Sequence, residues 1–167
     1  MILKPIEQPV LTERISDKPA IAITVGDPAG IGPEIVSKAI ANGEIFEICR
    51  PIVIAELGIL QREIDRNNLG IKIEAISEIT DQTEFLPGTL PLIDMGKPDR
   101  LPEYGKVDKA CGRAAFEYLA KAVELAEEGR ISAITTAPIN KLSIKAAGIP
   151  YTGHTEILGA LTETIDP

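Results

Sequence analysis

Short apolar runs and longer amphipathic stretches alternate along most of this chain. The apolar runs are rich in β-branched residues, which is typical of buried strands. The amphipathic stretches repeat apolar residues at the spacing of one helix face, and glycine follows several of them. The predicted strands are 20–25, 51–55, 71–76, 90–95 and 131–135, and the predicted helices are 33–42, 57–68, 108–128, 140–147 and one that begins near residue 155.

This order of elements predicts an α/β fold, layered, with a mainly parallel sheet and flanking helices. Aromatic residues make up only 4% of the chain, and tryptophan is absent. The core is therefore expected to consist of Ile, Leu, Val and Ala, which suits a sheet that is buried on both faces. Residues 1–19 are polar and mixed, so we expect them to form a loose N-terminal extension.

The formal net charge of the chain is −8. An acidic protein repels the phosphate backbone, so no nucleic-acid partner is expected unless basic residues cluster strongly. The nearest approach to a basic cluster is formed by Lys106, Lys109 and Arg113, and their spacing is typical of a solvated helix face.

The two cysteines, Cys49 and Cys111, are far apart and form no CxxC pair, which favours a reduced intracellular protein. Lys4, Glu7 and Glu13 interrupt any apolar region of a signal peptide. No apolar run approaches the ~20 residues that cross a membrane. We therefore expect a soluble, cytoplasmic protein without a membrane partner.

Residues 26–34, GDPAGIGPE, join a predicted strand to a predicted helix. Glycine permits a tight turn and the close approach of a ligand, and a helix N-terminus attracts anions. Asp27 follows the strand directly, at the sheet edge where open α/β sheets bind ligands. The spacing matches neither GxGxxG nor the P-loop, so a tight, capped turn without a ligand is an equal alternative.

A second polar segment, residues 135–141, also follows a predicted strand. Lys141 could meet an anionic group, although a lone lysine is more often only solvated. The single histidine, His154, lies between Gly153 and Thr155, where a glycine would let a ligand approach the ring. An imidazole can act as a base, a donor or a metal ligand, but a lone histidine is more often structural. Its neighbours favour a functional role.

No metal-binding or nucleophilic motif is visible in the chain. One histidine cannot form a multi-histidine metal centre within a single copy. The carboxylates of Asp27, Asp94 and Glu156 could bind a hard cation, but they do not have the spacing of a motif. Asp94 is expected to be a turn residue at the end of a strand. No serine lies in a nucleophile elbow, so a Ser-His-Asp triad is not indicated.

Three segments together resemble the 4-hydroxythreonine-4-phosphate dehydrogenase family of pyridoxal phosphate (vitamin B6) biosynthesis. They are residues 23–34 (ITVGDPAGIGPE), 134–141 (ITTAPINK) and 147–156 (AGIPYTGHTE). The first segment also resembles the corresponding turn of isocitrate and isopropylmalate dehydrogenases. The resemblance implies that fold, here truncated: an incomplete first α/β domain over 20–135, and over 136–167 the start of a second domain for substrate binding and dimerisation.

The resemblance also implies an activity. NAD, or alternatively NADP, accepts a hydride from the substrate's secondary alcohol, a divalent metal (Zn, Mg or Co) polarises the oxygen, and the β-keto acid product loses CO₂. His154 and Thr155 match the substrate-contacting residues of the family, and Asp27 and Lys141 are further candidates on the ligand side. Family members are homodimers of about twice this length, so the metal ligands are expected beyond this chain.

The sequence therefore predicts the N-terminal half of a cytoplasmic dehydrogenase for a phosphorylated small molecule, inactive by itself. Two alternatives remain open. A related enzyme of the same family would oxidise 4-phosphorylated threonate or erythronate. The chain could instead be a binding or dimerisation module without catalysis.

Overall fold

A computed structural model describes residues 18–80, 83, 85–96, 98, 100–151 and 153–164 of the chain. The predicted N-terminal extension lies outside these residues except for its last two positions. The strands are β1 (Ala20–Thr24), β2 (Arg50–Ala55), β3 (Lys72–Ile76), β4 (Thr89–Asp94) and β5 (Ala133–Thr136). The helices are α1 (Gly32–Asn42), α2 (Ile45–Ile48), α3 (Leu57–Arg66), α4 (Lys109–Glu127), α5 (Lys141–Ala146) and α6 (His154–Leu161).

The strands form one sheet in the order β3-β4-β2-β1-β5, and every neighbouring pair is parallel. The predicted α/β class and parallel sheet are therefore confirmed, and each predicted strand and helix is present within a few residues. The sequence pattern missed α2, because a single turn of four residues is too short to show helical periodicity.

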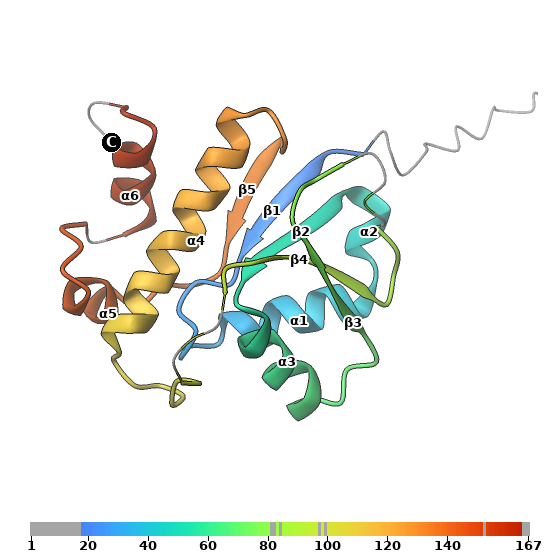
Figure 1. Cartoon of the computed structure of the whole chain (residues 1–167), viewed down its shortest axis with the longest axis horizontal. Helices are drawn as coiled ribbons and strands as arrows, with labels where there is room; N and C mark the ends of the chain where they lie inside the picture. Colours follow the sequence, from blue (N-terminus) through green and yellow to red (C-terminus); the bar gives the residue numbers. More distant parts are fainter. Residues whose placement is uncertain are drawn as a thin grey trace, which may run out of the picture.

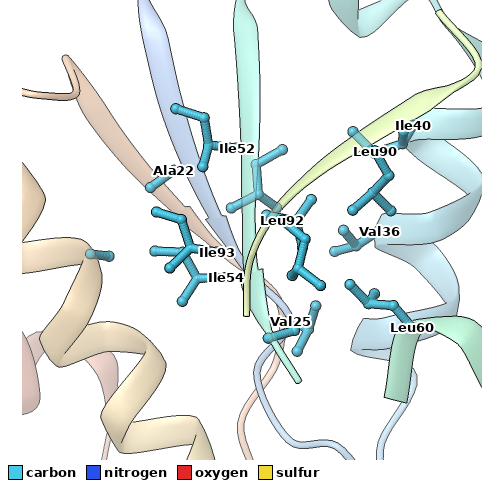
Figure 2. Close-up of a cluster of buried hydrophobic side chains, with 14 of the residues drawn as sticks. Ala22, Val25, Val36, Ile40, Ile52, Ile54, Leu60, Leu90, Leu92 and Ile93 are labelled. Atoms are coloured by element: carbon cyan, nitrogen blue, oxygen red, sulfur yellow. The ribbon is translucent and has the colours of Figure 1, made fainter. Parts of the chain in front are cut away.

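Helices cover both faces of the sheet. Helix α4 packs against β1, β2 and β5, whereas α1 and α3 pack together on the opposite face (Figure 1). Figure 2 shows the two apolar layers: Ile52 and Ile54 point to one side of the sheet, and Leu90 and Leu92 point to the other, toward α1. These side chains are fully buried. Because both faces are covered, the central strands are apolar except at their ends, which agrees with the core of Ile, Leu, Val and Ala that the sequence predicted.

A second, smaller apolar cluster lies between α4 and the last two helices. It consists of Ala115 and Leu119 of α4 packed with Ile144, Ile149 and Ile157. Helix α4 thus contributes to two cores, and α5 and α6 lie beside it, away from β3 (Figure 1). The predicted start of a second domain at residue 136 stays a prediction.

Strands are added to the sheet on both sides of β1. From β1 it passes through α1 and α2 to β2, the neighbour on one side. After β4 it passes through α4, on the opposite face, and adds β5 on the other side of β1. The carboxyl ends of β1 and β5 therefore flank a topological switch point, where open α/β sheets leave a crevice for ligands.

Candidate functional site

The turns that follow β1 and β5 meet at this switch point. The backbone N–H of Asp27 donates to the carbonyl oxygen of Pro138 at 3.0 Å. A third segment joins them, because the Gly105 N–H donates to the Ala29 carbonyl at 2.8 Å. Three stretches that are distant in sequence are thus tied together by backbone hydrogen bonds.

These three segments enclose a cavity of about 220 Å³. We call it the switch-point cavity, and it is lined by Asp27 and residues 29–31 of the first turn, by Gly105 and Lys106, and by residues 138–140. Asp27 therefore lies at the carboxyl end of β1, as predicted, and its role on the ligand side stays a prediction. Asn140, which caps α5 by accepting from the N–H groups of Leu142 and Ser143, also lines it.

Asp27 is only 3% exposed. Its Oδ1 accepts a 2.7 Å hydrogen bond from the Ala29 N–H, whereas Oδ2 has no hydrogen-bond partner among the residues that the structure describes. Burial raises the pKa of this carboxyl above its ordinary value; the Ala29 N–H and the nearby Ser143 hydroxyl oppose the shift, and Asp108 adds to it. An acceptor that is desolvated in this way gains from a ligand that can donate to it.

A second cavity, of about 460 Å³, lies beyond the first turn, on the side of β2. Three prolines and Ile59 contribute apolar walls, and Glu56 and Cys111 add titratable groups. Burial raises the pKa of Cys111 to about 12, so its thiol stays protonated and unreactive. Burial also raises the pKa of Glu56 to about 7, and the Tyr118 hydroxyl donates to its Oε2.

Glu56 makes the stability of the fold depend on pH. Its pKa is higher in the folded chain than the ordinary 4.5, so folding favours the protonated form. This contribution is fully present below pH 4.5 and is lost as the pH rises through about 7. The Glu56→Gln variant should be more stable than the unmodified chain at pH 8, by roughly 1–2 kcal/mol after allowance for partial exposure.

Urea unfolding at pH 8 and pH 4.5 tests this prediction. The advantage of Glu56→Gln should disappear at the lower pH, and Glu74→Gln, at an exposed position on β3, should show no such pH-dependent gain. Equal stability of Glu56→Gln and the unmodified chain at both pH values would contradict the assignment.

The structure corrects the prediction for Lys106. The sequence placed it with Lys109 and Arg113 on one solvated helix face, but α4 begins at Lys109 and Lys106 lies in the preceding loop. There it lines the switch-point cavity, although most of the side chain remains exposed. The one available signal was its position directly after Gly105 in a Gly-Pro-rich connection, which argued against a helix.

The other predicted site residues lie apart from this cavity. His154 is the first residue of α6, half-buried, and its Nε2 has no hydrogen-bond partner within the described part of the chain. Thr155 is exposed in the first turn of the same helix, and Lys141 is exposed at the start of α5. Neither His154 nor Lys141 lines the switch-point cavity. Asp94 is a turn residue as predicted: its Oδ1 accepts from Leu57 and Gly96.

The described residues contain neither a metal-binding cluster nor a membrane-spanning helix. No group of three or more His, Cys, Asp or Glu side chains among them could hold a metal ion. Within the same residues, no helix is both long and apolar enough to cross a membrane.

The parallel sheet with helices on both faces and a cavity at its switch point defines an α/β protein. Two solved structures share this fold, both of 4-hydroxythreonine-4-phosphate dehydrogenases. The Burkholderia phymatum protein is 41% identical with a TM-score of 0.83, and the Klebsiella pneumoniae protein is 37% identical with a TM-score of 0.81. Each comparison covers 89% of this chain and 45% of the other.

The curated relatives carry a different dehydrogenase name from that of the solved structures. Proteins from Clostridium botulinum strain Hall and Symbiobacterium thermophilum, provisionally named D-threonate 4-phosphate dehydrogenases, are 44% and 42% identical to this chain. The matches cover 92% and 90% of this chain, but only 46% and 45% of the two relatives. The chain therefore spans about half the length of these relatives.

The family model for the pyridoxal phosphate biosynthetic protein PdxA matches residues 47–167. The chain belongs to this family, as the resemblance in its sequence indicated. Since its relatives are named dehydrogenases, the family is one of oxidoreductases.

Proposed function

We propose that the protein carrying this chain is an NAD-dependent and metal-dependent dehydrogenase of a 4-phosphorylated hydroxy acid. It oxidises a secondary alcohol to a β-keto acid, which then decarboxylates. The first candidate substrate is 4-hydroxythreonine 4-phosphate, in vitamin B6 biosynthesis. The names of the curated relatives favour the second candidate, D-threonate 4-phosphate. The observation that supports the proposal most strongly is the arrangement of Gly153, His154 and Thr155 at the start of α6 in a chain of this family.

This helix start offers hydrogen-bond donors to an anionic substrate. The first intrahelical bond runs from the Ile157 N–H to the Gly153 carbonyl, so the N–H groups of His154 and Thr155 have no acceptor within the helix. They lie at the positive end of the helix dipole, which favours phosphate or carboxylate oxygens. The Thr155 hydroxyl is exposed beside them. The His154 Nε2 is buried and has no hydrogen-bond partner among the described residues, so it would reach a substrate oxygen only if the side chain turns outward. These groups would bind and orient the substrate.

The proposed cofactors differ in how they fit the described residues. The switch-point cavity, with Asp27, Lys106 and Asn140 around it, fits part of a dinucleotide. NAD supplies the hydride acceptor when bound. No cluster of side chains among the described residues fits a metal ion.

We further propose that the active protein is a cytoplasmic homodimer and that this chain by itself has no dehydrogenase activity. A non-catalytic binding or dimerisation module remains the alternative for the isolated chain. If the isolated chain binds the phosphorylated substrate at α6, it carries a functional part of the substrate site. If it does not, only the structural alternative is left.

Removal of the Thr155 hydroxyl should weaken substrate binding. In calorimetric titrations with D-threonate 4-phosphate and 4-hydroxythreonine 4-phosphate, Thr155→Val and His154→Ala should each raise the Kd by about tenfold or more, the usual effect of one lost hydrogen bond to a charged group. Thr135→Val is the matched control, because Thr135 is also exposed but lies on β5. If all three variants bind like the unmodified chain, α6 is not the substrate site.

A further inference from the structure

One loop, residues 100–107, forms part of the wall of both cavities. We call this loop the strap, and we call the cavity of about 460 Å³ the larger cavity. Arg100 and Pro102 of the strap line the larger cavity, and Gly105 and Lys106 line the switch-point cavity. A displacement of this single loop would therefore open both cavities to the solvent.

The strap buries little of its own surface. Pro102 is its one buried residue, and all the others are exposed. Its large apolar side chains, Leu101, Tyr104 and Val107, are between 43% and 52% exposed. Segments with few buried apolar contacts open at a lower free energy than a packed core does. The position of the strap must therefore depend mainly on polar contacts.

Polar side chains of α3 supply most of these contacts. The Tyr104 hydroxyl donates to Glu63 Oε1 at 2.5 Å. The guanidinium groups of Arg62 and Arg66 lie over the Tyr104 ring, at 4.1 and 4.6 Å from its centroid. Arg62 also donates to the Pro102 carbonyl at 2.7 Å. One exposed tyrosine and one proline carbonyl thus tie the strap to a helix that belongs to the main core.

The burial of Glu63 strengthens its hydrogen bond with Tyr104. Glu63 is 1% exposed, and its Oε2 has no hydrogen-bond partner among the residues that the structure describes. Its Oε1 accepts from Tyr104 and, at 3.1 Å, from the Nε of Arg62. A buried carboxylate with so few donors loses much of its stabilisation when one of them leaves. This hydrogen bond therefore favours the closed position of the strap.

The backbone holds the strap more weakly than it holds the elements on either side. Within the described part of the chain, a single backbone hydrogen bond joins the strap to other segments, from the Gly105 N–H to the Ala29 carbonyl at 2.8 Å. The flanking elements, β4 and α4, are held by the sheet ladder and by helical hydrogen bonds. The strap can therefore move away without the loss of either element.

We propose that the strap is a lid over the larger cavity, held closed by the hydrogen bond from Tyr104 to Glu63 and by the two arginine side chains stacked on the Tyr104 ring. Opening breaks these contacts together with the hydrogen bond of Gly105, and it admits water and ligands to the cavity. This inference concerns access to the cavity and does not depend on the proposed substrate or cofactor.

The two cysteines of the chain report the position of the lid independently. Cys111 lines the larger cavity and is 4% exposed. Its thiol lies close to Ala29, the residue to which Gly105 donates. A thiol reagent should therefore reach Cys111 when the strap opens. Cys49 is also buried, but it follows α2 and lines neither cavity, so it becomes accessible only when another part of the fold opens.

The test measures the rate at which iodoacetamide modifies each cysteine of the folded chain, by mass spectrometry of the peptides. In the unmodified chain, Cys111 should react at least roughly a hundredfold more slowly than in the chain unfolded by urea. Tyr104→Phe keeps the ring but loses the hydroxyl, and should raise the rate at Cys111 about tenfold, the usual effect of one lost hydrogen bond to a charged group. Tyr104→Leu also loses the stacking of the arginines and should raise it further. Neither variant should change the rate at Cys49.

Tyr151→Phe is the matched control, because Tyr151 packs against the smaller apolar cluster beside α4 and not against the strap. It should leave both rates unchanged. The proposal is wrong if neither Tyr104 variant changes the rate at Cys111, or if Cys111 of the unmodified folded chain reacts as fast as in the unfolded chain. Equal increases at Cys49 and Cys111 would show that Tyr104 stabilises the whole fold and not the strap, and would also overturn it.

Discussion

Replacement of Gly112 by alanine is expected to cost the fold roughly 3 kcal/mol and to displace α5 from α4. A Cβ atom at this position would lie 2.0 Å from the carbonyl oxygen of Ser143 and 2.6 Å from the backbone nitrogen of Ile144. Backbone atoms cannot rotate away as a side chain can, so one helix must move. Because Ser143 lies close to Asp27, the shift should also disturb the switch-point cavity.

Urea unfolding of Gly112→Ala and Gly58→Ala measures this effect. Gly58 is also helical, in α3, but its Cβ would meet only a Leu101 side-chain atom at 3.8 Å. Gly58→Ala should therefore be neutral or stabilising by up to about 1 kcal/mol, because alanine favours helix. Similar unfolding free energies for the two variants would show that α4 and α5 are not in such close contact.

Replacement of Gly26 by alanine is the second change with a large expected effect. Gly26 has a φ of +67°, and its Cβ would lie 2.2 Å from the Pro138 carbonyl oxygen, the acceptor of the Asp27 N–H. The variant should lose roughly 3 kcal/mol of stability, from backbone strain and from separation of the two turns.

Gly88→Ala isolates the contribution of the close contact. Gly88 also has a positive φ, +87°, but no atom lies within 4 Å of its Cβ position. This variant should show only the backbone strain of about 1–2 kcal/mol. If both variants lose the same stability, the turns after β1 and β5 are not in such close contact.

Much of the fold could be predicted because local patterns determine it. The β-branched runs that became β1, β2 and β4 are buried by helices on both faces, so their apolar character showed in the sequence. The order of the strands could not be predicted. Nothing within β4 itself indicates that it lies between β3 and β2, since that order depends on contacts between distant segments.

Less of the site could be predicted, because it also depends on contacts between distant segments. Asp27 follows a strand directly, so its position at the ligand edge followed from the local pattern. The position of Lys106 depends on the hydrogen bond from Gly105 to the Ala29 carbonyl and on that from Arg62 to the Pro102 carbonyl, which join residues about forty to eighty positions apart. The sequence also correctly placed His154 at the start of a helix, whereas its contact with substrate stays a prediction.

The central claim is that the protein carrying this chain oxidises a 4-phosphorylated hydroxy acid with NAD. The most direct test incubates the product of the native gene with NAD, a divalent metal and each of the two candidate substrates, and follows the absorbance of NADH. The account predicts NADH formation with D-threonate 4-phosphate, with 4-hydroxythreonine 4-phosphate or with both, and none with unphosphorylated D-threonate. A folded gene product that forms no NADH with either phosphorylated acid would contradict the claim.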